Sequence, residues 1–181
     1  GEATRRDIAV NAVLAGCSPK HLPVLISAVR ALNAPEINLR GVNATTHCVA
    51  PLLIVHGKYA VEAEYNGGLG AFGPDNISNA VTGRALRLIL LHIAGATPGN
   101  GDASTQGGPA KYSYCVAENL QDSPWGSYAS TTGVDTESAV TVHCGEAPHN
   151  VHDMESSEPA PILDKIASAM CSWGQNNAPI S

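Results

Sequence analysis

The pattern of apolar and polar positions predicts helices and strands in alternation along the chain. A Ser-Pro pair, which suits a helix start, precedes apolar side chains at helical spacing and predicts a helix over Pro19–Leu32. The most apolar run, Ala80–Ala94, is apolar around most of its circumference. It predicts a largely buried helix with Arg84 and Arg87 on its one polar edge. An amphipathic helix is predicted over Pro161–Cys171, where the apolar residues fall on one side.

Shorter apolar or alternating segments predict the strands. Pro51–His56 is apolar and is followed by a glycine, and Lys111–Ala117 and Ser138–His143 alternate between apolar and polar residues. Ile37–Thr45 alternates in part and also predicts a strand, whereas Ile8–Ala15 fits either a strand or the start of a helix. We therefore expect an α/β fold with about four or five strands, a largely buried central helix and two amphipathic helices.

Composition and charge narrow the class of protein. The 181 residues are 44% hydrophobic and 14% charged, which suits a single compact domain over residues 1–181 and argues against disorder. A net charge of −6 without a basic run argues against nucleic acid or a membrane as partner, and Leu86–Ala94 is too short to span a bilayer. Five cysteines without C-x-x-C spacing, and no signal peptide at the start, predict a cytoplasmic protein.

A glycine-rich loop over Asn66–Pro74 precedes the apolar helix and marks the first candidate site. Glycine lets the backbone approach a ligand closely, and the N-terminus of the next helix offers unpaired N–H groups and a positive dipole end. The loop therefore predicts a site for a small polar or anionic molecule. Gly68-x-Gly70-x-x-Gly73 matches a dinucleotide fingerprint, but it lacks a clean preceding strand and a later acidic residue, and a plain turn is the alternative.

Several side chains of the predicted elements suit catalysis. Cys17 precedes a helix start, which can lower a thiol pKa and favour a nucleophile, redox group or metal ligand; the alternative is a small packed side chain. Glu118 follows a predicted strand and fits a catalytic acid or a solvated carboxylate. His149 and His152 fit general acid/base catalysis or metal binding. Arg84 fits two-pronged carboxylate binding, or an edge residue that covers apolar surface.

Two His-Cys dipeptides suggest a transition metal as a cofactor, although their spacing matches no standard closed site. In a strand, the two side chains of a dipeptide would point to opposite faces, so that at most one of each pair could reach a shared ion. The candidate metal ligands are Cys17, His47, Cys48, His143, Cys144, His149 and His152.

Segments spread over most of the chain resemble, in this order, the carboxy-terminal part of the UGSC-type (seleno)protein family. They are NAVLAGCSPKHLPVLISAV (Asn11–Val29), ATTHCVAPLLIVHG (Ala44–Gly57), NGGLGAFGPDNISNAVTGRALRLILLHIAGATPG (Asn66–Gly99), GGPAKYSYCVAEN (Gly107–Asn119), SPW (Ser123–Trp125), ESAVTV (Glu137–Val142) and HNVHD (His149–Asp153). The resemblance loosely implies thiol or selenol chemistry. It also implies an amino-terminal α/β region with the selenocysteine-or-cysteine motif, which these residues do not include. The positions it carries over are Cys17, Thr45, Thr46, Asn66, Gly68, Gly70, Gly73, Arg84, Glu118, Asn119, His149, Asn150 and Asp153.

Three functions stay open. The first is an enzyme or enzyme subunit acting on a small anionic substrate, with Cys17, Glu118 and His149 as nucleophile, acid/base and proton shuttle. The second is a metal-assisted hydratase or lyase, and the third is a non-catalytic binding or scaffold subunit. The apolar helix and the missing region lead us to expect a homo- or hetero-oligomer, with a separate subunit carrying that region as one form of partner.

Overall fold

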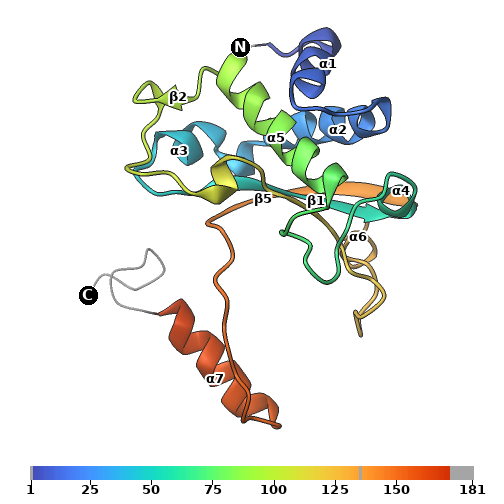
Figure 1. Cartoon of the computed structure of the whole chain (residues 1–181), viewed down its shortest axis with the longest axis vertical. Coiled ribbons are helices and arrows are strands. Elements are labelled where there is room, and N and C mark those ends of the chain that lie inside the picture. The colour runs from blue at the N-terminus through green and yellow to red at the C-terminus, as the bar shows by residue number, and fades with distance from the viewer. Residues whose placement is uncertain (1, 135, 172–181) are drawn as a thin grey trace. The chain divides into compact units, whose positions relative to one another are not determined.

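A three-stranded mixed sheet lies at the centre of the first part of the chain (Figure 1). The computed structural model describes residues 2–134 and 136–171. The middle strand, β1 (Ala50–Gly57), pairs in parallel with β4 (Cys115–Ala117) and antiparallel with β5 (Ser138–Gly145). The predicted α/β class is confirmed.

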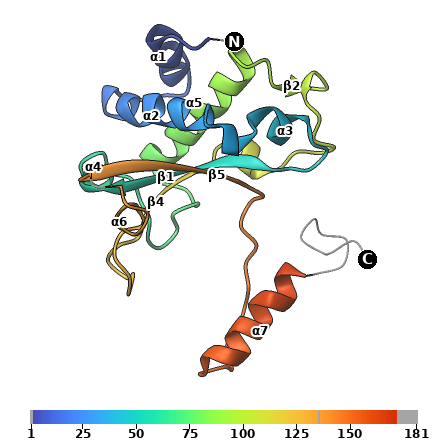
Figure 2. The same cartoon turned by 180° about the vertical axis from the view of Figure 1, so that it is seen from behind.

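Three helices cover one side of this sheet, and α6 (Tyr128–Thr131) lies on the other (Figures 1 and 2). They are α1 (Arg5–Leu14), α2 (Leu22–Leu32) and α5 (Ile77–His92). Their apolar faces and the inward residues of β1 form one core. Among the described helices, none is long and apolar enough to cross a bilayer.

Short elements connect these parts. The helices are α3 (Leu39–Ala44), α4 (Lys58–Glu62) and the 3₁₀ turns η1 (Pro19–His21), η2 (Pro35–Ile37) and η3 (Pro109–Lys111), and β2 (Thr97–Pro98) pairs with β3 (Gly101–Asp102). Contacts divide the chain into two units, residues 1–147 and 148–181. The second unit contains α7 (Pro159–Met170), and one domain over residues 1–181 stays a prediction.

The strongly periodic predictions are confirmed. The Pro19–Leu32 helix forms as η1 followed by α2, and the apolar run forms most of α5. The strands predicted at Pro51–His56 and Ser138–His143 are β1 and β5. Ile8–Leu14 belongs to a helix, α1, which begins after a Thr4 capping box, and Ala15 caps its end.

Three local predictions were wrong. Ile37–Thr45 is not a strand, because Asn38 adopts a left-handed conformation (φ 44°) and its side chain accepts a hydrogen bond from the Gly41 N–H at 3.3 Å, which starts α3. The strand predicted over Lys111–Ala117 is shortened to three residues, because the preceding proline begins the turn η3. Arg87 does not lie on a polar edge of α5, because its side chain is buried.

Gly83 lets α5 approach the segment before β4 closely. A Cβ at Gly83 would lie 2.4 Å from Ser113 Oγ and 2.5 Å from the Tyr114 backbone nitrogen. The Ser113 hydroxyl also donates to the Ala80 carbonyl at 2.8 Å, so the two segments are fixed together. A side chain at Gly83 therefore has to push the helix off the sheet.

We expect Gly83→Ala to lower the free energy of unfolding by about 1–3 kcal/mol, the usual cost of overpacking. The matched control is Gly68→Ala, where the nearest atom to the new Cβ lies at an ordinary 3.5 Å. Urea unfolding followed by circular dichroism measures both. Equal stability of the two variants would show that the close approach of α5 is not tight.

Candidate functional site

A pocket of about 420 Å³ lies between α5 and the segment that follows it. We call it the α5 pocket, and we call residues 96–112 the pocket loop. The helix contributes Arg84, Arg87 and Leu91, and the loop contributes residues that include Asp102 and Lys111. Most of this loop has no apolar period in the sequence, a pattern that is usually functional or mobile in a compact domain.

Asp102 holds the floor of the α5 pocket together. Its carboxylate accepts hydrogen bonds from Arg87 Nη2 at 2.5 Å and from Lys111 Nζ at 3.0 and 3.1 Å. Ser104 adds its N–H at 3.0 Å and its hydroxyl at 2.6 Å. The side chains of Asp102, Lys111 and Arg87 are only 3%, 8% and 10% exposed, so this ion cluster is shielded from water.

The backbone of the pocket loop is anchored to its surroundings. Arg87 Nη2 also donates to the Ala96 carbonyl at 3.1 Å, where the loop leaves α5. Further along, the Ala103 N–H donates to the Asn43 carbonyl and the Thr105 N–H donates to the Thr46 carbonyl, both at 3.0 Å. The predicted binding residue Thr46 thus supports the loop through its backbone.

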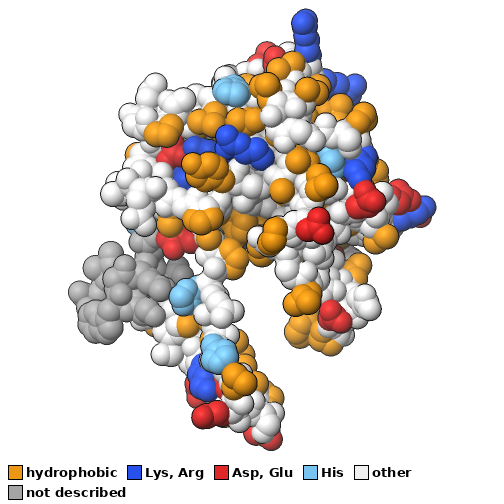
Figure 3. All heavy atoms as spheres, viewed as in Figure 1, with side chains coloured by type: hydrophobic (Ala, Val, Ile, Leu, Met, Phe, Trp, Pro, Cys, Tyr) orange, Lys and Arg blue, Asp and Glu red, His pale blue; other side chains and the backbone are white. Residues whose placement is uncertain are grey.

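The α5 pocket carries surplus positive charge. Burial alone would raise the pKa of Asp102, but hydrogen bonds from Ser104, Lys111 and Arg87 hold it well below its usual range, so the group stays ionised. Arg87 and Lys111 against one carboxylate leave one surplus positive charge, and Arg84 in the pocket wall makes two. Figure 3 shows Lys and Arg side chains gathered beside an acidic group on the face seen in Figure 1.

Arg84 is held in place by an aromatic ring. Its Cζ lies 5.6 Å from the centre of the Tyr112 ring, a cation–π contact that leaves the edge of the guanidinium for other partners. Both residues line the α5 pocket. Of the predicted binding residues, Arg84 is therefore the one whose side chain lines this pocket.

We expect Asp102→Asn to lower the free energy of unfolding by about 3–5 kcal/mol at neutral pH, because two buried cations lose their counter-ion. A carboxylate with a depressed folded pKa stabilises the fold above its unfolded pKa and loses this effect as the pH falls through the folded value. The gap between wild type and variant should therefore narrow below about pH 4.

Urea unfolding at several pH values measures this, with Asp75→Asn at an exposed position as the control. A gap independent of pH would argue that the cost comes from packing and not from charge.

Three asparagines connect the predicted glycine loop to the start of α5. Asn66 Nδ2 donates to Asn76 Oδ1 at 2.8 Å, Asn76 Nδ2 donates to the Gly70 carbonyl at 2.7 Å, and Asn79 Nδ2 donates to the Asn66 carbonyl at 2.8 Å. The adjoining cavity is only about 120 Å³. The loop's own acceptors are thus used internally.

The loop needs glycine at two positions, and only Gly70, whose φ of 67° is left-handed, belongs to the fingerprint. A Cβ at Gly67 would lie 2.3 Å from the Ala117 carbonyl oxygen, so Gly67 lets the loop pack on β4. A Cβ built at Gly68 or Gly73 would have no neighbouring atom nearer than 3.1 Å, and a Cβ at Gly70 would have none within 4 Å. Backbone packing accounts for this loop without a dinucleotide.

Cys17 is a half-buried thiol that donates to the Val81 carbonyl, with Sγ 3.4 Å from the oxygen. Burial raises the pKa of Cys17 to about 11. This is the opposite of the lowered pKa that a helix start would give. The thiol therefore stays protonated near neutral pH.

We expect iodoacetamide to alkylate Cys17 far more slowly than the exposed Cys171 at pH 8, with a rate that rises up to about pH 11. Peptide mass spectrometry of timed samples measures both sites in one protein. A Cys17 rate that levels off near pH 7 would instead indicate an activated thiolate.

Glu118 lies beside a histidine that the sequence did not single out. Its Oε2 is 2.8 Å from His56 Nδ1, and its Oε1 accepts from the Tyr128 N–H at 2.6 Å. The neighbouring Asn119 donates to Asp122 at 2.7 Å. His56 is the last residue of the predicted strand Pro51–His56, and Glu118 directly follows the predicted strand Lys111–Ala117. Parallel pairing of these two strands places both residues at the same edge of the sheet, and this was the signal that could have identified His56.

The predicted metal ligands do not gather. Exposed His143 and half-buried Cys144 are neighbours on β5 and so point to opposite faces. Across residues 2–134 and 136–171, no three His, Cys, Asp or Glu side chains form a group that could hold a metal ion. Exposed His47 follows Thr45, whose hydroxyl accepts from the His47 N–H at 3.2 Å. Cys48 Sγ lies 4.0 Å from where a Cβ at Gly108 would be, beside the wall of the α5 pocket.

The remaining predicted residues belong to the second unit. His149, Asn150 and His152 are exposed there. Asp153 binds Lys165 at 2.8 Å and accepts from two backbone N–H groups. These hydrogen bonds, led by that of Lys165, hold the pKa of Asp153 well below its usual range.

Comparison with protein-family models, curated proteins and solved structures finds no match to this chain. Membership of the UGSC-type family therefore stays a prediction that rests on the sequence segments alone.

Proposed function

We propose that this chain is an enzyme or enzyme subunit that binds a small anionic molecule, bearing carboxylate or phosphate groups, in the α5 pocket. One observation carries the proposal: two buried cations, Arg87 and Lys111, share a single carboxylate, Asp102. A buried cation without a full counter-charge costs free energy, and an anionic ligand removes that cost. The proposed ligand is the small anionic molecule predicted from the sequence, but its proposed binding site is the α5 pocket and not the glycine loop.

The donors of the α5 pocket support this class of ligand. Arg87 makes both of its protein hydrogen bonds through Nη2, so that Nε and Nη1 have no protein acceptor within the described part of the chain. Arg84 adds a second planar guanidinium, a group that matches two oxygens of a carboxylate or phosphate. Among the described residues that line the pocket, Asp102 is the only acid, so little opposes an incoming anion.

Thiol chemistry at this pocket is proposed for Cys48 in place of Cys17. Cys48 adjoins Gly108 in the pocket wall, whereas burial keeps the Cys17 thiol protonated. A non-catalytic binding subunit would use the same pocket without turnover. A metal-assisted hydratase or lyase has less support, because the described residues form no group of three side chains that could hold a metal ion. Assembly with copies or other subunits remains part of the proposal.

Titration calorimetry with inorganic phosphate and with succinate tests the proposal. We expect Arg84→Gln to weaken binding at least tenfold, about 1.4 kcal/mol, because one charge-assisted pair is lost. The matched control is Arg40→Gln on α3, an exposed arginine that does not line the pocket, which should bind as wild type does.

Equal weakening by Arg84→Gln and Arg40→Gln would mean that overall charge, and not the α5 pocket, attracts the anion. Absence of binding for both probes in the wild type would contradict the proposal. Raising the salt concentration should weaken the contribution of Arg84 to anion binding more than that of Arg87, because Arg87 is shielded from water.

A further inference from the structure

We propose that the Glu118–His56–Thr141 chain is a second site, in which Thr141 Oγ1 acts as a nucleophile toward activated acyl esters. This activity goes beyond anion binding in the α5 pocket. It rests on different residues, at the His56 end of β1. The failure of either proposal would leave the other standing.

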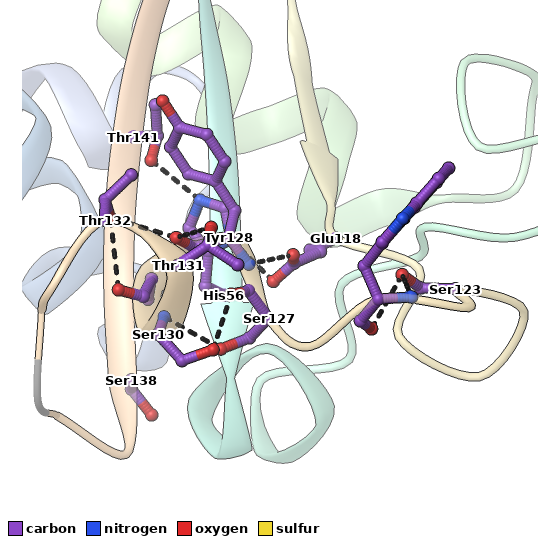
Figure 4. A network of polar contacts seen from close by, with 12 residues as sticks. His56, Glu118, Ser123, Ser127, Tyr128, Ser130, Thr131, Thr132, Ser138 and Thr141 are labelled. Atoms are coloured by element: carbon purple, nitrogen blue, oxygen red, sulfur yellow. Dashed lines mark hydrogen bonds and ion pairs between the residues drawn. The ribbon is translucent and has the colours of Figure 1, made fainter.

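The three side chains form a continuous line of hydrogen bonds (Figure 4). Glu118 Oε2 lies 2.8 Å from His56 Nδ1, and Thr141 Oγ1 lies 2.8 Å from His56 Nε2. A hydroxyl, an imidazole and a carboxylate in this order are the parts of an activated nucleophile: a weak nucleophile, a base within hydrogen-bond reach, and a group that orients the base.

The position of the proton follows from the partners. A carboxylate only accepts, so Nδ1 of His56 carries the proton and donates it to Glu118. In the neutral imidazole Nε2 is then an acceptor, and the Thr141 hydroxyl donates to it. This is the tautomer that a general base needs in order to take the hydroxyl proton.

The fold holds this arrangement in a fixed geometry. Thr141 pairs with Ile54 across the antiparallel strands, and His56 is two residues further along β1, so both side chains lie on the same face of the sheet. Tyr128 stacks on the His56 ring with centroids 6.0 Å apart, and its N–H fixes the second oxygen of Glu118. The His56 side chain is 2% exposed, while Thr141 keeps partial contact with solvent.

Backbone donors flank the hydroxyl. The Leu53 N–H and the Val55 carbonyl form hydrogen bonds on the β4 side of β1. The residues that alternate with them, Ile54 among them, therefore form theirs on the β5 side, and the backbone groups of Thr141 pair with those of Ile54. The N–H groups of Val140 and Val142 then face away from β1, and in the described sheet β5 is an edge strand. Such donors suit an oxyanion that develops beside Thr141.

The reaction with an aryl ester has two steps, acylation of Thr141 and hydrolysis of the acyl-threonine. The Thr141 oxygen attacks the carbonyl carbon while His56 Nε2 takes the hydroxyl proton. The bond from the acyl carbon to the aryl oxygen breaks, and the aryl oxide leaves with the electron pair and receives the proton from His56. Water then attacks the acyl-threonine, with His56 as base, and releases the carboxylic acid and the free hydroxyl.

The experiment treats the full chain with p-nitrophenyl acetate and follows nitrophenol release and the site of acetylation by peptide mass spectrometry. We expect acetylation on Thr141, its loss in Thr141→Val, and its retention in Thr141→Ser. His56→Gln should slow acylation by about 100-fold or more, the usual contribution of a general base. The control is Thr132→Val, whose hydroxyl bonds only to backbone carbonyls nearby and which should react as wild type does.

Glu118 is a positioning residue in this proposal. Glu118→Gln should lower the maximal acylation rate while leaving the ester concentration for half-maximal rate unchanged, in protein whose thermal melting shows that it is folded. Acetylation confined to lysine or cysteine, an unchanged rate in the shape-matched Thr141→Val, or no acetylation at all would overturn the proposal.

Discussion

The pairing of Asp102 with Arg87 is the interaction on which the arrangement around α5 depends. It joins the buried side of the helix to the pocket loop, whose buried apolar residues are only the small Ala96 and Ala110. Lys111 and Ser104 bind the same carboxylate, and Ala110 of η3 packs with Tyr114 against Ala50 at the start of β1. A single carboxylate thus shapes both the pocket and one end of the sheet.

The opposite end of β1 is organised by a second polar chain. His56 is the one polar side chain of β1, and both of its ring nitrogens have hydrogen-bond partners. The two candidate sites therefore lie at opposite ends of one strand. The apolar middle, Leu53 and Val55, keeps them apart while fixing both to the same rigid element.

The sequence predicted what is periodic and missed what depends on distant pairing. Helices α2 and α5 and strands β1 and β5 follow from apolar patterns that burial enforces. The error at Asn38 is local, since one side chain bonded to the backbone outweighed an alternating pattern. Arg84 and Glu118 were identified by residue type and position. Their partners were not, because nothing in the chain order tells that Asp102 meets Arg87 or that His56 meets Thr141.

The buried ion cluster is explained better by a role in binding than by a contribution to stability. Replacing a buried ion cluster with apolar residues of similar volume is often neutral or stabilising, so stability alone gives little reason for Arg87, Asp102 and Lys111 in this position. A cluster with equal numbers of charges could still be explained as a fixed structural link. Two cations on one carboxylate, with Arg84 beside them, leave guanidinium donors without an acceptor among the described residues, and this supports the proposed small anionic ligand.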